Sequence, residues 1–207
     1  TLKATTSGLV YTVRAGSNYQ TMDGIVFQIQ GYVANSQYDY STAANDVAVI
    51  TIQGTFAGVP NVQPIAMHTT EIDPTTPNLP NCFILGWGWT GSATSANLKK
   101  AEYKLITNAA CSPTYSSPVP SVQCAQSVTG FGCYSDGGSP LICDSRLYGL
   151  YAEGSCNTKV SQAINRFAKL PSADIKSFLS SLPPEPTAAP SQVQPRKNYL
   201  TCPCTAC

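Results

Sequence analysis

The chain has 207 residues, of which 11% are charged, and its formal net charge at pH 7 is +1. Such a weakly charged chain lacks the basic surface that would recruit nucleic acid or an anionic membrane. No apolar run approaches the roughly 18 residues that a membrane-spanning helix needs, so we expect no nucleic-acid or membrane partner. The 15 glycines and 16 prolines, with many serines and threonines, are typical of an all-β protein with short strands and frequent turns.

The first 70 residues predict a group of short strands. Runs rich in β-branched and aromatic residues occur at 9–13, 24–32 and 47–52. The last run alternates with the period of two that a half-buried strand needs. A turn-rich connector with three prolines follows at 68–81. We therefore assign residues 1–70 to a first structural unit.

A second unit is expected over residues 71–182. Its predicted strands cover residues 82–87, 101–107, 140–143, 147–151 and 160–165. A helix follows, because Ser172 is a suitable N-cap and apolar residues recur on one face from Ile175 to Leu182. Closely spaced prolines then make residues 183–207 a stiff, extended tail.

Several motifs in this chain occur in a fixed order. They are Val-Arg-Ala-Gly-Ser at 13–17, the segment 24–38, Asn-Asp-Val-Ala-Val-Ile at 45–50, Phe-Ile-Leu-Gly-Trp-Gly at 83–88 and Cys-Tyr-Ser-Asp-Gly-Gly-Ser-Pro-Leu-Ile-Cys at 133–143. Together they resemble the motifs of chymotrypsin/trypsin-like serine proteases. The Gly-Trp-Gly-Trp run at 86–89 is most similar to the variant in oomycete trypsin-like proteins, which include secreted glucanase inhibitor proteins. The resemblance implies an all-β, chymotrypsin-like double β-barrel with a C-terminal helix, followed here by the proline-rich tail.

The resemblance also implies that the first barrel is incomplete on its N-terminal side. In the family, a Cys-Gly-Gly strand and an Ala-Ala-His-Cys turn come before the motif found here at 13–17, and neither occurs in this sequence. About three strands of the first barrel are therefore missing, which leaves open edges and an uncovered apolar face. We expect that the sequence is part of a longer chain. Otherwise the isolated product would be poorly stable or would pair with another surface.

The family's reaction needs a serine nucleophile, a histidine and a carboxylate that orients the histidine. When the segment at 133–143 is aligned from its cysteines, Gly137 occupies the nucleophile position, and glycine has no side-chain oxygen. Asp46 matches the family's triad aspartate. The only histidine, His68, follows Asp46 in the chain, whereas the family's histidine precedes the aspartate. We therefore expect no intact catalytic triad and classify the chain as a pseudoprotease rather than an enzyme.

Ser135 and Ser139 lie two residues before and after the nucleophile position. Productive geometry tolerates an error of about one ångström, so a displacement of two residues would be disabling. The alternative is a secreted serine-type endopeptidase with an atypical nucleophile loop. It would require one of these serines to attack and a histidine that the sequence does not contain.

The residues expected at the specificity pocket also depart from the family's pattern. Phe131 occupies the pocket floor, where a trypsin would carry an aspartate. Tyr151, Ala152 and Glu153 replace the Ser-Trp-Gly wall, and we expect Glu153 to enter the substrate channel. These changes predict a degenerate pocket.

The resemblance implies three disulfides: Cys82–Cys143, Cys111–Cys124 and Cys133–Cys156. They indicate an oxidising compartment. The remaining three of the nine cysteines are Cys202, Cys204 and Cys207. We favour disulfide pairing or an intermolecular bridge for them over a metal site, and we expect no metal and no cofactor.

Together these features predict a secreted, extracellular protein that acts by binding another protein. The resemblance suggests an effector that binds and inhibits host plant endo-β-1,3-glucanases in the apoplast and so promotes virulence. Two alternatives stay open at this point. They are the endopeptidase described above and a decaying fragment without function.

Overall fold

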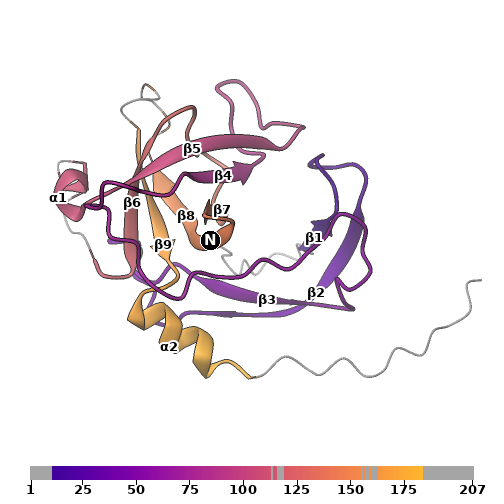
Figure 1. The fold of residues 1–207 in the computed structure, drawn as a ribbon. Helices are drawn as coiled ribbons and strands as arrows, with labels where there is room; N and C mark the ends of the chain where they lie inside the picture. The colour runs from indigo at the N-terminus through magenta and orange to yellow at the C-terminus, as the bar shows by residue number, and fades with distance from the viewer. Residues whose placement is uncertain are drawn as a thin grey trace, which may run out of the picture.

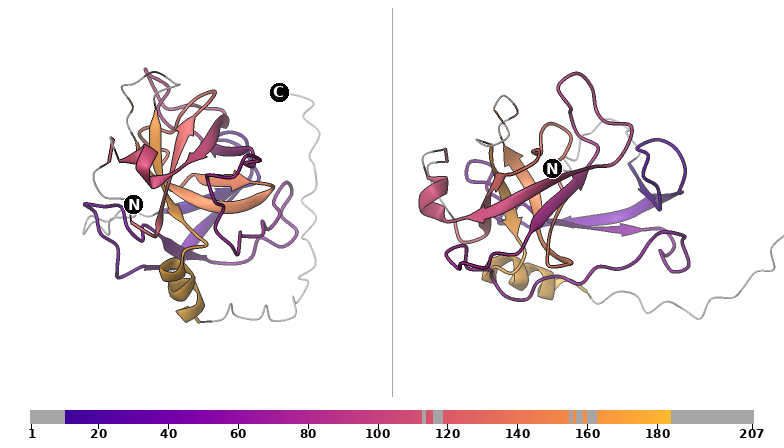
Figure 2. Two further views of the ribbon diagram at one scale, coloured as in Figure 1. Left: turned by 60° about the vertical axis from the view of Figure 1, so that its left-hand side comes forward. Right: turned by 45° about the horizontal axis from the view of Figure 1, so that its top comes forward.

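The computed structural model describes residues 11–112, 114–115, 119–154, 156, 159 and 163–183. Their strands form an open three-stranded sheet and a closed six-stranded barrel, and the sheet extends to one side of the barrel (Figure 1; Figure 2, right). The predicted tail and its three cysteines lie outside the described residues. Neither helix in the described part of the chain is long and apolar enough to cross a membrane.

The closed barrel has the strand order β4-β5-β6-β9-β8-β7, and every neighbouring pair is antiparallel. Its strands are β4 (Cys82–Gly86), β5 (Lys99–Ile106), β6 (Val122–Ser127), β7 (Pro140–Cys143), β8 (Arg146–Gly154) and β9 (Ile164–Lys169). Alternate residues point inward and pack as a core that includes Ile84, Leu105, Leu141, Tyr148 and Phe167. The barrel thus buries one apolar face and leaves no free edge.

The structure differs from the sequence prediction at two of these strands. β6 was not expected, because its residues Val-Gln-Cys-Ala-Gln-Ser show no clear apolar alternation. The last strand was expected at 160–165 but occupies Ile164–Lys169. Both strands are defined by their pairing with each other, which connects segments about 40 residues apart.

Helix α2 (Ala173–Ser181) occupies the predicted place and packs against the outside of the barrel (Figure 1). Ile175 is fully buried among Val47, Ala168 and Leu170. Ser172 stands at the N-cap position, but its hydroxyl makes no capping hydrogen bond. The apolar contacts of Ile175 therefore hold the helix, and they join it to the loop that carries Val47. A shorter helix, α1 (Asn108–Cys111), precedes β6.

The first sheet contains β1 (Thr12–Ala15), β2 (Ile25–Ala34) and β3 (Ala48–Ile52), with β2 in the centre. A bulge interrupts the β2–β3 ladder between Ile29 and Gly31. Large apolar side chains on this sheet remain exposed, which fits the expected incomplete barrel. They include Ile25, Val26, Tyr32, Val33 and Ile50, each at least 40% exposed.

Two groups of hydrogen bonds attach the sheet to the barrel. At one end the carbonyl of Asn18 accepts from the backbone N–H of Leu98 at 2.7 Å and from the indole of Trp87 at 3.0 Å. At the other end the Asn45 N–H donates to the Ser121 hydroxyl at 3.1 Å. The loop around residue 45 and the loop around residue 18 thus hold the sheet at a defined position relative to the barrel.

The three disulfides implied by the resemblance are present. They are Cys82–Cys143, Cys111–Cys124 and Cys133–Cys156. The first joins β4 to β7 in the buried core, and the second joins α1 to β6. The third joins the loop before β7 to the loop after β8.

Replacing both cysteines of the Cys82–Cys143 bridge with alanine should destabilise the protein more than the same change at Cys111–Cys124. The bridges span 61 and 13 residues, so loop-closure entropy predicts losses of about 4 and about 3 kcal/mol. Urea unfolding under non-reducing conditions measures both. Equal losses would mean that the longer loop is already constrained in the unfolded chain.

Candidate functional site

The loop between β6 and β7 contains the position expected for the nucleophile. Its backbone makes two successive turns, in which Asp136 N–H donates to the Cys133 carbonyl at 3.1 Å and Ser139 N–H donates to the Asp136 carbonyl at 2.9 Å. The N–H of Gly138 donates to the Tyr151 carbonyl at 2.8 Å and so attaches the loop to β8. Gly137 is exposed between these anchored residues and presents no side chain. The loop is therefore well ordered but has no nucleophilic atom at that position.

Asp136 is the buried carboxylate of this loop, with 8% of its surface exposed. Its Oδ1 accepts from the N–H of Gly88 at 2.9 Å, and its Oδ2 accepts from the N–H of Cys133 at 3.0 Å. Burial raises the pKa of Asp136, and the two hydrogen bonds only partly oppose this effect. Asp136 belongs to none of the ion pairs among the described residues.

The glycines of the Gly-Trp-Gly run make room for this carboxylate. A Cβ atom on Gly86 or on Gly88 would lie 2.1 Å from a carboxylate oxygen of Asp136. Close packing therefore requires glycine at both positions. One contact thus joins the motif at 86–88 to the motif at 133–143.

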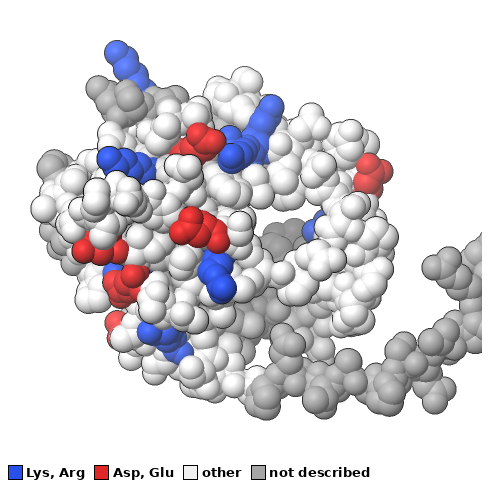
Figure 3. Space-filling model, viewed as in Figure 1, with Lys and Arg blue, Asp and Glu red and all other residues white. Residues whose placement is uncertain are grey.

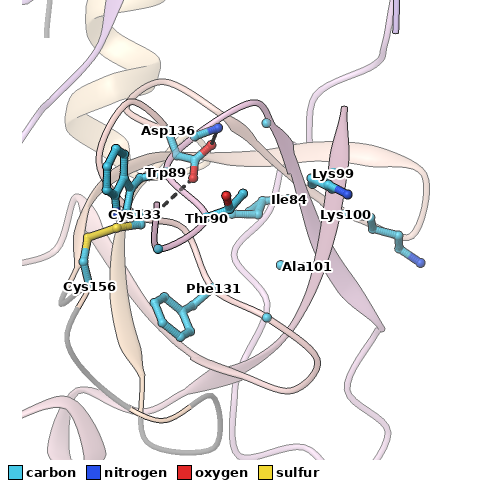
Figure 4. Close-up of a pocket in the computed structure, with 14 residues that line it drawn as sticks. Ile84, Trp89, Thr90, Lys99, Lys100, Ala101, Phe131, Cys133, Asp136 and Cys156 are labelled. Carbon is cyan, nitrogen blue, oxygen red and sulfur yellow. Dashed lines mark hydrogen bonds between the residues drawn. A yellow bond between two sulfur atoms is a disulfide. The ribbon is translucent and has the colours of Figure 1, made fainter. Parts of the chain in front are cut away.

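A cavity of about 290 Å³ lies beside Asp136 (Figure 4). Its walls include the apolar side chains of Ile84, Trp89 and Phe131. Lys100 borders the cavity but points away from Asp136 and pairs with Glu102 at 3.0 Å (Figure 4). The carboxylate thus lies beside a space with several apolar walls, and among the described residues it forms no ion pair.

His68 has a structural role in the connector between the two strand groups. Its Nε2 lies 3.0 Å from the Cys143 carbonyl, and its ring packs edge-to-face on Tyr148. This contact holds the His68 ring against the end of β7. Ser139 precedes β7 and Cys143 ends it, so at roughly 3.3 Å per residue the two positions are about 13 Å apart.

Asp46 lies in the loop before β3, and its carboxylate makes no hydrogen bond with any described residue. Its side chain is half-buried, and this burial raises its pKa. His68, the histidine of this chain, is bound to β7 instead. No hydrogen bond links Asp46, His68 and Gly137 in the described part of the chain.

Tyr151, predicted for the pocket wall, contacts Gly132, the residue after Phe131, which was predicted for the pocket floor. The hydroxyl of Tyr151 donates to the Gly132 carbonyl at 3.0 Å, and the Gly132 N–H donates to the Tyr103 hydroxyl at 2.7 Å. A Cβ atom on Gly132 would lie 2.5 Å from the ring of Tyr151. Burial raises the pKa of both tyrosines. Phe131, next to Gly132, lines the cavity near Asp136, and no space for a substrate side chain remains between Gly132 and Tyr151.

Glu153 was expected in the substrate channel, but its carboxylate pairs with the buried guanidinium of Arg166 on β9. Arg166 also donates to the Thr42 carbonyl at 2.8 Å and lies over the ring of Tyr115. This pair therefore helps to hold the first sheet's loop against the barrel. Ala152, between Tyr151 and Glu153, is half-buried.

Sequence reasoning missed Tyr103, Asn165 and Arg166. The Tyr103 hydroxyl donates to the fully buried Asn165 side chain at 2.5 Å. A polar residue in an apolar strand is a signal of a buried hydrogen bond. The partners are tens of residues away, so no local pattern identifies them. Among the described residues, no group of three or more His, Cys, Asp and Glu side chains could hold a metal ion.

Comparison with known proteins agrees with this geometry. The family model described as trypsin matches residues 5–171. The chain belongs to the trypsin family. It is 30% identical over 151 residues to trypsin alpha-4 of Lucilia cuprina, an alignment that covers 70% of this chain and 58% of that protein. It is 25% identical over 152 residues to the vitellin-degrading protease of Bombyx mori, with 70% and 56% covered.

The chain therefore spans less than two thirds of the length of these relatives. Among solved structures, it is similar to neuropsin, a serine protease expressed in the limbic system of mouse brain. The TM-score is 0.69 at 23% identity, with 83% of this chain and 78% of neuropsin covered. It is also similar to the scabies mite inactivated protease paralogue S-D1, with a TM-score of 0.68 at 20% identity and coverages of 82% and 76%. The fold is the predicted chymotrypsin-like double barrel, with an incomplete first barrel and a C-terminal helix.

Substituting Gly88 with alanine should destabilise the protein by about 2 kcal/mol or more, because the added Cβ overlaps the Asp136 carboxylate. In an Asp136→Ala background the same substitution should cost less than about 1 kcal/mol. Urea unfolding of the wild type, Gly88→Ala, Asp136→Ala and the double variant measures the coupling free energy between residues 88 and 136. Gly31→Ala is the control, because a Cβ there meets no atom within 4 Å. Additive effects would show that the contact is not the reason for the glycine.

The burial of Asp136 also predicts a pH dependence. Its folded pKa lies above the ordinary value of 3.8, so the unfolded state ionises first as the pH rises. Compared with Asp136→Asn, the wild-type protein should lose stability from about pH 3.8 upward, until the pH exceeds the folded pKa. Measuring the unfolding free energies of the wild type and Asp136→Asn across this pH range tests whether the wild type loses stability as the pH rises. A wild-type advantage that grows with pH would contradict a raised pKa.

Proposed function

We propose that this trypsin-family protein is secreted, is proteolytically inactive and acts by binding another protein. The observation that carries the proposal is Gly137, which occupies the loop position where the family's nucleophile is expected. Acyl transfer cannot begin without an attacking oxygen, whatever residues surround it.

Three further features support the absence of catalysis. His68 Nε2 lies 3.0 Å from the Cys143 carbonyl, so the ring is held at the end of β7. Tyr151, at the expected pocket wall, contacts Gly132 next to the expected floor residue Phe131, and a Cβ atom on Gly132 would overlap its ring. Asp46 has no hydrogen-bond partner among the described residues. Each of these would have to change before hydrolysis became possible.

An exposed aromatic pair beside the same loop supports a binding role. Trp89 is 41% exposed and Tyr134 is 66% exposed, and the Trp89 N–H donates to the Tyr134 carbonyl at 2.8 Å. Tryptophan and tyrosine are enriched where proteins bind one another, because a large apolar body carries a polar group. The hydrogen bond and the anchored loop fix the backbones of both residues.

As the partner we propose a plant endo-β-1,3-glucanase, inhibited outside the host cell so that defence is suppressed. This part rests on the resemblance of the Gly-Trp-Gly-Trp run at 86–89 to the oomycete glucanase inhibitor proteins. The exposed Trp89 belongs to that run. Secretion is supported by the three disulfides, which persist in oxidising compartments.

The competing function is a serine-type endopeptidase with an atypical nucleophile loop. It is favoured by family membership and by the two serines that flank Gly137. Ser135 is exposed and has a left-handed backbone with φ of 69°, a conformation that is uncommon for serine. A histidine near either serine would be needed as the base.

A fluorophosphonate probe discriminates between the two functions. We expect no covalent labelling of Ser135 or Ser139, measured by intact-mass spectrometry against active trypsin as the positive control. Gly137→Ser should also remain unlabelled and should not cleave peptide substrates, because His68 is bound elsewhere. Stoichiometric labelling of the wild-type protein at one serine would establish the endopeptidase instead.

The binding partner can be tested with plant extracellular fluid. The immobilised protein should enrich an endo-β-1,3-glucanase, and the free protein should lower its hydrolysis of β-1,3-glucan. Trp89→Ala with Tyr134→Ala should weaken binding at least about tenfold, as expected for central aromatic residues. Tyr40→Ala is the matched control, because Tyr40 is 79% exposed and lies in a different loop. If the glucanase is neither enriched nor inhibited, this partner is wrong.

A further inference from the structure

We propose that Asp23 and Gly24 form a site of spontaneous isomerisation, at which the main chain comes to run through the side chain of Asp23 as isoaspartate. The chain contains two aspartate–glycine pairs, Asp23–Gly24 and Asp136–Gly137. The surroundings of the two carboxylates favour the reaction at the first pair and oppose it at the second. The inference does not depend on the proposed function, and either can fail without the other.

The reaction joins the side chain of an aspartate to the next backbone nitrogen. The Gly24 nitrogen attacks Cγ of Asp23, a C–N bond forms, and the carboxyl hydroxyl leaves as water with the amide proton. Water then opens the cyclic succinimide at one of its carbonyls. Opening at Cγ restores aspartate, whereas opening at the original backbone carbonyl gives isoaspartate. Glycine favours ring closure because it has no Cβ to hinder the nitrogen.

The carboxylate of Asp23 is free to turn toward this nitrogen. Asp23 and Gly24 are both exposed, in the loop between β1 and β2. Arg14 donates to the backbone carbonyl of Asp23 at 2.5 Å and leaves the carboxylate alone. Among the described residues, that carboxylate belongs to no ion pair. Charged side chains are also sparse over β1, β2 and their loop (Figure 3).

Asp136 and Gly137 are the same dipeptide in the opposite environment. Asp136 is only 8% exposed, and its two carboxylate oxygens accept from Gly88 at 2.9 Å and from Cys133 at 3.0 Å. Turning this carboxyl group onto the Gly137 nitrogen would break both hydrogen bonds. The reaction at this pair therefore requires a local opening of the fold. The chain thus contains its own matched control.

Isoaspartate at position 23 would lengthen the main chain in a tightly packed turn. It adds one carbon to the backbone directly before Gly24 and Ile25, and Ile25 begins β2. Gly24 has a φ of 66°, and a Cβ atom there would lie 2.3 Å from the Ala15 carbonyl oxygen. Space for even one added carbon is therefore lacking, so the loop has to shift.

The loop that would shift is one of the two that attach the first sheet to the barrel. Within it, the carbonyl of Asn18 accepts from the Leu98 N–H and from the Trp87 indole, and Gln20 N–H donates to the Ala96 carbonyl at 3.0 Å. Loosening these hydrogen bonds would release the sheet from the strand-connecting segment 87–98. Isomerisation at Asp23 thus changes the contact between the two strand groups as the protein ages.

Peptide mapping by mass spectrometry that separates isoaspartyl from aspartyl peptides tests the site. The folded protein is kept in neutral buffer for several weeks, and isoaspartate should form at least about tenfold faster at position 23 than at position 136. In urea the two pairs should react at similar rates, because the fold no longer holds Asp136. Equal rates in the folded protein would overturn the proposal. So would the absence of isoaspartate at position 23 while the unfolded chain reacts at both pairs.

Tryptophan fluorescence tests the consequence, because Trp87 is one of only two tryptophans in the chain. The emission of the aged wild-type protein should shift to longer wavelength relative to the unaged sample, as the Trp87 indole loses the Asn18 carbonyl and meets water. Asp23→Glu is the control, because the longer side chain keeps the charge but does not form a succinimide. An equal shift in aged Asp23→Glu would show that isomerisation at position 23 is not what loosens the loop.

Discussion

The contact between the Asp136 carboxylate and the Gly-Trp-Gly run joins the loop after β6 to the end of β4. One carboxylate oxygen accepts from Gly88 and the other from Cys133, in space that exists only because residues 86 and 88 have no side chain. This contact fixes the position of Gly137, the path of the chain into β7 and one wall of the neighbouring cavity. The shape of the loop is therefore set by this contact, and Gly137 at its exposed position carries no side chain.

Other side chains near this loop are also held by specific contacts. Tyr103 and Tyr151 use their hydroxyls to hold Gly132. Glu153 pairs with Arg166, which also reaches the loop of the first sheet. These contacts attach the loop after β6 and the loop of the first sheet to the barrel.

The two strand groups differ because only one of them is closed. In the described part of the chain, the second barrel buries its apolar residues and pairs every strand on both sides, whereas β1 and β3 of the first sheet each pair with β2 alone. Exposed edges and exposed apolar faces both favour association with another polypeptide. The closed barrel thus provides a fixed support for the loops that carry the site.

The sequence by itself determined the family, the six cysteines that pair, most strands and the residue at position 137, because motifs and apolar alternation are local patterns. β6 escaped prediction, since its polar sequence becomes a strand only through its pairing with β5 and β9. Only the tertiary structure decided what His68 and Glu153 do. His68 contacts Cys143, 75 residues away, and Glu153 contacts Arg166 across a β-ladder. Which partner a side chain reaches depends on the direction in which the folded backbone points it, and that direction is set by the packing of the whole barrel.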